Sequence, residues 1–166
     1  MNADSALAFL LLEKLGQRRV SVFSDSVDDW GFAGFPLNRE TNAADPKKAP
    51  QSRFIAPTAY PVTLRPGIVI SDPQGTQELY PRVYVASGKS LPAKVPDGKV
   101  IHVPYTELLN TNGTPRAAMD IWNILVKAGV PRYAEIISFS DDPGEAAANY
   151  FILKLMGYPD VKVLVM

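Results

Sequence analysis

Cysteine is absent from the 166-residue sequence, and histidine occurs once, at His102. Without cysteine the chain can form no disulfide bond, no thiolate metal site and no cysteine nucleophile. A single histidine excludes metal sites built from several histidines and fits an ordinary Ser-His-Asp triad poorly. Residues 87–90 are similar to the last residues of a phosphate-binding loop, but Val83 stands where such a loop has its first glycine. We therefore expect no metal and no cofactor.

An excess of charge is also absent, because 17 basic residues balance 17 acidic ones. A chain of this kind has no general affinity for nucleic acid or for an anionic membrane surface. No apolar run approaches the roughly 20 residues that cross a bilayer. Residues 6–12 are apolar, but Asp4 precedes them and no basic leader is present, so we expect no signal peptide.

Short apolar runs alternate with helical patterns in the second half of the chain. Thr114 is a candidate cap for a helix that begins at Pro115 and is stopped by Gly129. A helical turn is expected at 105–109 and a last long helix from Pro143. This alternation predicts an α/β fold with a parallel sheet covered by helices on both faces. The expected strands are 67–71, 82–86, 99–103, 136–139 and 161–165.

The chain begins with a second helix-strand pattern. Asp4 or Ser5 is expected to cap a helix that ends near Leu15, before Gly16, and a strand is expected at 20–24. The helix is apolar on almost every side, so it must be covered on more than one side. We expect it to pack on the sheet of the same chain, or to bind a protein partner or another copy in a homo-oligomer.

The two ends of the chain match each other without a gap. Residues 8–16 align with 149–157, and 20–23 align with 161–164, at the constant offset of 141 that separates Gly16 from Gly157. One interpretation is an internal repeat of a helix-strand unit. The alternative is a chance similarity between two apolar helices. Residues 38–66, rich in proline, alanine and asparagine, are expected to form an extended linker.

Several segments resemble the rhodanese family of sulfurtransferase domains. Asp29-Trp30-Gly31-Phe32-Ala33-Gly34-Phe35-Pro36 is similar to the tail that ends a family domain, and Phe139-Ser140 stands where the family has Tyr-Cys. Residues 96–109 resemble the segment around the family's Gly-His-Ile-Pro-Gly-Ala motif, and residues 72–74 lie near its Asp-x-Arg, without the arginine. The resemblance implies a three-layer sheet domain at 67–166, preceded by the linker 38–66. Residues 1–37 would be the remnant of an upstream repeat.

The resemblance also identifies the loop where the family does its chemistry. Family members carry sulfur as a persulfide on a loop cysteine, and this position is Ser140 here; the position of the family's loop arginine is Glu145. A thiolate is nucleophilic near neutral pH and holds the transferred sulfur, whereas a hydroxyl can do neither. Asp141, Asp142 and Glu145 would repel an anionic donor such as thiosulfate. No catalytic residue is therefore expected in the loop 140–145, which includes Gly144.

Three interpretations of the loop remain. In the first, Asp142 caps the last helix, Pro143 begins it and Glu145 reaches back to complete a capping box. In the second, Ser140 is a nucleophile assisted by Asp141 or Asp142. In the third, Asp141, Asp142 and Glu145 bind a cation. An engineered Cys→Ser replacement would explain Ser140 but not Glu145.

Two functions follow from these patterns. The first is a rhodanese-like domain without sulfurtransferase activity that serves as a binding or structural module. The second is part of a sulfurtransferase-type enzyme whose active cysteine lies on a missing or partner segment. His102 is expected to be a packed strand residue at the far end of its strand, away from the loop.

Overall fold

A computed structural model describes residues 2–17, 19–22, 27–36, 63–72 and 80–166 of the chain. The chain divides into two compact units, residues 1–24 with 63–166, and residues 25–62. The described part of the smaller unit contains one helix, α2 (Val27–Phe32), which the sequence analysis did not predict. Most of the linker expected at 38–66 lies outside the described residues, and the proposed domain division stays a prediction.

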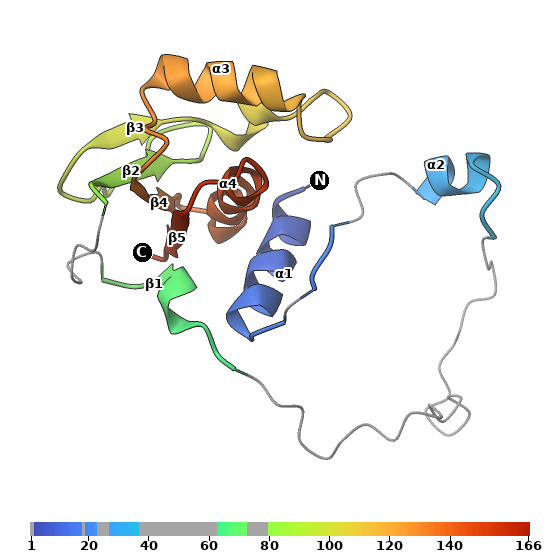
Figure 1. The fold of residues 1–166 in the computed structure, drawn as a ribbon, viewed down its shortest axis with the longest axis horizontal. Helices are drawn as coiled ribbons and strands as arrows, with labels where there is room; N and C mark the ends of the chain where they lie inside the picture. Colours follow the sequence, from blue (N-terminus) through green and yellow to red (C-terminus); the bar gives the residue numbers. More distant parts are fainter. Residues whose placement is uncertain (1, 18, 23–26, 37–62, 73–79) are drawn as a thin grey trace. The chain divides into compact units, whose positions relative to one another are not determined.

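The larger unit contains a sheet of five parallel strands in the order β1-β5-β4-β2-β3 (Figure 1). All five residues of the central strand β4 are buried, as a parallel sheet covered by helices requires. This confirms the predicted α/β class with flanking helices. The strands are β1 (Val69–Ile70), β2 (Arg82–Ala86), β3 (Val100–His102), β4 (Glu135–Phe139) and β5 (Asp160–Leu164).

The register of the sheet places the ends of three neighbouring strands in one row. Ala86 lies opposite His102 on one side and opposite Phe139 on the other. The loops that follow β2, β3 and β4 therefore leave the sheet side by side. Loops at this carboxyl edge are the preferred place for ligands and chemistry in parallel α/β sheets.

Two clusters of buried side chains lie on the faces of the sheet. The larger cluster joins alternate residues of β2, β4 and β5, such as Val85, Ile136 and Val163, to residues of three helices. These helices are α1 (Ala3–Lys14), α3 (Ala118–Ala128) and α4 (Pro143–Leu155). The smaller cluster gathers intervening strand residues such as Tyr84 and Phe139, and its described members are all strand residues.

Helix α1 packs on α4 of the same chain, and Figure 1 shows the two helices side by side. Ala6, Phe9 and Leu10 are buried in this contact, and the rings of Phe9 and Phe151 meet edge to face at 5.0 Å. The cap of α1 is Asn2, whose side chain accepts a hydrogen bond from the Ser5 backbone N–H, so the expected caps Asp4 and Ser5 were wrong by two to three positions.

Two other local predictions were wrong. Residues 20–22 form no strand although Val20 and Val22 pack on the larger cluster; residues 23 and 24 lie outside the described part. An apolar run becomes a strand only where a neighbouring backbone pairs with it. Helix α3 begins at Ala118 rather than at Pro115, because the side chain of Asn112 binds Thr114 in a turn. Two 3₁₀ turns, Pro66–Ile68 and Tyr105–Leu108, complete the unit.

A buried carboxylate lies at the beginning of β4. Glu135 is 1 % exposed and accepts hydrogen bonds from Arg82 at 2.6 Å and from Lys162 at 2.7 Å, on the strands to either side. Burial would raise the pKa of Glu135, but the hydrogen bonds and charges of Arg82 and Lys162 outweigh it and hold the pKa below its ordinary value. The three side chains fasten β2, β4 and β5 together at their amino ends.

We predict that the contact between α1 and α4 contributes substantially to stability. Leu10→Ala removes a side chain that is 2 % exposed and should lower the free energy of unfolding by about 2–5 kcal/mol. Leu11→Ala, on the same helix but 47 % exposed, is the control and should change it by about 0.5 kcal/mol. Urea unfolding followed by circular dichroism measures both. Equal effects of the two substitutions would contradict the packing of α1 described above.

We predict that Glu135 makes stability depend on pH in the acid range. A carboxylate whose pKa is lowered on folding stabilises the protein above its unfolded pKa, and this contribution is lost as the pH falls through the folded value. Glu135→Gln should therefore cost about 1–3 kcal/mol at pH 7, and its difference from the wild type should shrink as the pH is lowered below about 4.5. Urea unfolding at several pH values tests this. The exposed Glu107→Gln is the control; a pH-independent effect of Glu135→Gln would refute the prediction.

Candidate functional site

The loop between β4 and α4 lies at the carboxyl edge of the sheet, where the loops after β2 and β3 also emerge. Ser140 directly follows β4 and is 6 % exposed. Asp141 and Asp142 are exposed, Gly144 is buried and Glu145 is half-buried. The structure thus brings together all the loop residues that the resemblance singled out, with the hydroxyl inside and two of the three carboxylates outside.

The cap of α4 is formed as the first interpretation predicts, with one difference. Asp142 is the N-cap, its side chain accepts a hydrogen bond from the Gly144 N–H at 2.8 Å, and Pro143 is the first helical residue. Glu145 does not reach back to the cap residue. Its Oε2 accepts a hydrogen bond from Ser140 Oγ at 2.6 Å, while the Asp142 N–H points to Ser140 Oγ at 3.4 Å. The serine hydroxyl lies between the two groups that a capping box would join.

The loop after β2 packs against this serine and glutamate. A Cβ atom at Gly88 would lie 2.7 Å from Glu145 Oε2 and 2.9 Å from Ser140 Oγ, so only glycine fits there without a shift. The Gly88 carbonyl accepts a hydrogen bond from His102 Nε2 at 2.8 Å. His102 is exposed and lies at the same edge as the loop. The expectation of a packed histidine at the far end was wrong, because β3 ends level with β2.

A buried chain of polar side chains joins the three loops beneath the surface. Asn149 Nδ2 donates to Ser87 Oγ at 3.0 Å and to the Val103 carbonyl at 2.8 Å. The hydroxyls of Ser87 and Ser138 share a hydrogen bond of 2.6 Å, and each also lies within reach of a carbonyl oxygen, that of Val85 at 3.3 Å for Ser87 and that of Ala146 at 2.9 Å for Ser138. Sequence reasoning missed this network. The available signal was three small polar residues within otherwise apolar segments.

The electrostatics of the loop are negative. Burial raises the pKa of Tyr105, and the negative charges of Glu145 and Asp142 raise it further. Within the described part of the chain, no group of three or more acidic or histidine side chains is placed to hold a metal ion, so the cation interpretation finds no support in the geometry. The nucleophile interpretation needs a base for Ser140. The carboxylate that accepts the hydrogen bond of the Ser140 hydroxyl belongs to Glu145, rather than to Asp141 or Asp142.

The side chains of the loop bind one another, and the Ser140 hydroxyl is not presented as a reactive group. The Ser140 hydroxyl is buried and held by a carboxylate, and a serine oxygen cannot form a persulfide. Helix α1 approaches the loop closely at Gly144, where a Cβ atom would lie 2.9 Å from the Cβ of Ala3. The first turn of α1 therefore packs against the first turn of α4, next to the loop.

Comparison with known proteins gives a likeness of fold. No protein-family model and no curated protein matches the chain. Among solved structures, wild-type EanB matches 98% of this chain with a TM-score of 0.71 and 16% identity. An EanB variant in complex with ergothioneine gives a TM-score of 0.72 at 17% identity, again over 98% of this chain. A variant that carries a cysteine persulfide, in a tetrahedral intermediate state with ergothioneine, gives 0.69 at 17% identity over 98%.

The chain spans 41% of the length of EanB in these three matches. The likeness covers almost the whole chain, although fewer than one residue in five is identical. It agrees with the resemblance carried by residues 67–166, and it concerns the fold rather than the chemistry. The chain has the α/β fold of a rhodanese-like domain, similar to that of the rhodanese-domain sulfurtransferase EanB, and it contains no cysteine.

Proposed function

We propose that this chain is a rhodanese-like domain without sulfur-transfer activity, which serves as a binding or structural module. The observation that carries the proposal is the 2.6 Å hydrogen bond from Ser140 to Glu145. It joins the two positions at which the resemblance places the sulfur-carrying cysteine and the anion-binding arginine. Both chemical functions are replaced, one by a hydroxyl and the other by a carboxylate.

The charge of the loop supports the same proposal. An anionic sulfur donor would meet the carboxylates of Asp141, Asp142 and Glu145 at the head of α4. Two like charges about 4 Å apart repel by roughly 4 kcal/mol at an effective dielectric constant near 20. The positive end of a helix offers about half an elementary charge, which does not offset several carboxylates. The loop is thus poor at binding the donor as well as at reacting with it.

Assembly through α1 is part of the proposal. Its inner face is buried on α4, but Leu11, Leu12 and Leu15 are 47, 42 and 48 % exposed. Leucines at this spacing form one stripe along a helix, and contiguous apolar patches of this kind are typical of protein interaction sites. We propose that this stripe binds a protein partner or a second copy of the chain.

A second candidate is a sulfurtransferase-type enzyme whose cysteine lies on another segment or a partner. The observation in its favour is that the chain spans 41% of EanB, in which one variant carries a cysteine persulfide. A coding sequence that continues upstream into a strand followed by a cysteine loop would favour this candidate.

We predict that the purified chain does not transfer sulfur. With thiosulfate and cyanide, thiocyanate should form at the rate of the control without protein, because no thiolate is available to carry the sulfur. Turnover well above that control, or a covalent sulfane adduct detected by mass spectrometry, would refute the proposal. Ser140→Cys alone should remain inactive, because Glu145 still faces the introduced thiol.

The introduced thiol offers a control that does not depend on turnover. Burial and the neighbouring carboxylate both disfavour the thiolate, so Ser140→Cys should have a thiol pKa above the usual 8.5 or so. Ser140→Cys/Glu145→Gln removes the like charge and should lower that pKa by about one unit or more. The pH dependence of alkylation by iodoacetamide measures both. Equal pKa values in the two variants would show that Glu145 does not control the loop.

We predict that the exposed stripe of α1 governs association. Leu11→Glu/Leu15→Glu places charges on the stripe and should lower the molar mass measured by light scattering at high concentration, while Leu155→Glu, an exposed leucine on α4, should leave it unchanged. If the wild type is monomeric at every concentration, a second copy is excluded as the partner, and the proposal is confined to a different protein.

A further inference from the structure

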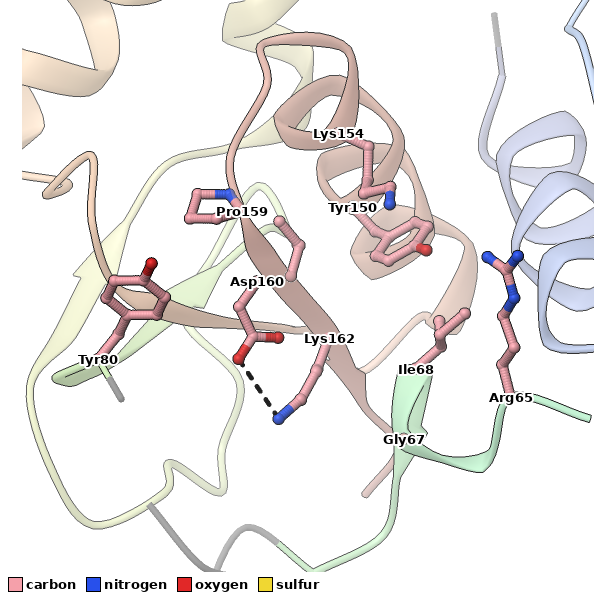
Figure 2. A pocket seen from close by; sticks show the side chains of 10 residues that line it. Arg65, Gly67, Ile68, Tyr80, Tyr150, Lys154, Pro159, Asp160 and Lys162 are labelled. Atoms are coloured by element: carbon pink, nitrogen blue, oxygen red, sulfur yellow. Dashed lines mark ion pairs between the residues drawn. The ribbon is translucent and has the colours of Figure 1, made fainter. Parts of the chain in front are cut away.

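A cavity of about 500 Å³ lies beside the second half of α4, at the edge of the sheet opposite to the loop (Figure 2). Its walls come from residues just before β1, from Tyr80 just before β2, and from the beginning of β5. These are the amino ends of parallel strands, whereas Ser140 follows a carboxyl end. The cavity, here named the basic pocket, is lined by Arg65, Gly67, Ile68, Tyr80, Tyr150, Lys154, Pro159, Asp160, Val161 and Lys162.

Three cationic side chains line the basic pocket, and they differ in how they are neutralised. Lys162 is held by Glu135 at 2.7 Å and by Asp160 at 3.6 Å. Within the described part of the chain, neither Arg65 nor Lys154 forms an ion pair. Their two charges are therefore available to a ligand, and Figure 2 shows them on either side of the Tyr150 hydroxyl.

The hydroxyl of Tyr150 cannot serve as a donor to an anion. It donates its proton to Glu13 Oε2 at 2.6 Å. Burial and this hydrogen bond raise the pKa of Tyr150, while the nearby charge of Arg65 lowers it by less. The hydroxyl therefore stays protonated, with its oxygen available only as an acceptor. Recognition of an anion falls to Arg65 and Lys154.

The remainder of the lining is suited to an apolar body. Ile68, Pro159 and Val161 supply apolar surface. Tyr80 is half-buried, and its ring stands across the cavity from Arg65 in Figure 2. A volume of about 500 Å³ lies within the range of small-molecule sites, which combine apolar walls with a few convergent polar groups.

We propose that the basic pocket binds a small molecule with an oxyanion head group and a flat apolar body. Arg65 and Lys154 hold the head group, which is a carboxylate or a phosphate. Arginine offers a planar pair of N–H donors that matches either oxyanion, and lysine adds a point charge. The body of the ligand lies against Tyr80 and Pro159. This site shares no residue with the loop and does not depend on whether the loop transfers sulfur.

Isothermal titration of the full chain with three probes tests the proposal. Phenyl phosphate and benzoate carry the oxyanion, and benzyl alcohol carries the same ring without the charge. We expect both anions to bind at least about ten-fold more tightly than the alcohol; the tighter of the two identifies the preferred head group. Inorganic phosphate should bind more weakly than phenyl phosphate if the apolar walls contribute.

Matched variants assign the binding to this pocket. Arg65→Gln and Lys154→Gln should each weaken phenyl phosphate or benzoate binding about ten-fold. Lys94→Gln removes the same charge from an exposed residue outside the lining and should have no effect. Two separate variants guard against a folding defect, which thermal unfolding would reveal. Equal binding of benzyl alcohol, or unchanged binding in both variants, would overturn the proposal whatever the thiosulfate assay gives.

Discussion

The burial of α4 between the parallel sheet and α1 is the constraint on which the rest of the larger unit depends. Tyr150, Ile152 and Leu153 are among its buried side chains, and burying each large apolar side chain contributes roughly 1.5–3 kcal/mol. The close approach of α1 to Gly144 brings the amino ends of two helices together. Both ends are positive, and each helix has an acidic residue in its first turn, Asp4 in one and Glu145 in the other. This electrostatic arrangement is sufficient to account for the acidic residues at the head of α4.

The position of the loop 140–145 is set by the elements around it. The loop emerges where the ends of β2, β3 and β4 are level in register. Buried hydrogen bonds also hold the loop in place, and they run from Asn149 through Ser87 to Ser138. A buried polar group is costly unless it is paired; Asn149 Nδ2 and the two serine hydroxyls are paired, whereas Asn149 Oδ1 is buried without a hydrogen-bond partner. Ser140 then donates a hydrogen bond to Glu145 within the loop. This internal hydrogen bond supports the proposed binding or structural role.

The sequence predicted elements wherever the local signal and the tertiary environment agree. The strand 82–86 was predicted with its observed bounds, and strands on both sides pair with it. Asp142 as a cap and Gly129 as a helix stop were confirmed, because each depends on neighbours within a few residues. One failure was local: Thr114 donates to the side chain of Asn112, two residues before it, instead of capping α3. Another occurred where a distant partner decides, because the run at 20–24 lacks a pairing strand in its described part. The acceptor role of Glu145 was missed for a related reason, since it depends on where Ser140 lies after the sheet has formed.

Charged side chains are neutralised differently at the buried beginning of β4 and on the surface near the carboxyl end of α4. At the buried amino edge of β4, one carboxylate is matched by two cations, because an unpaired charge there would be costly. Near the carboxyl end of α4, Lys154 is exposed and needs no such partner, and Arg65 is likewise exposed. Surface charges of this kind cost little to maintain and contribute little to stability. Within the described residues Arg65 and Lys154 form no ion pair, and they line a cavity in which Tyr150 already donates to Glu13 and Lys162 is already paired with Glu135 and Asp160. The proposed preference of the basic pocket for an anion therefore depends on the two cations without an ion pair, Arg65 and Lys154, rather than on the number of basic residues.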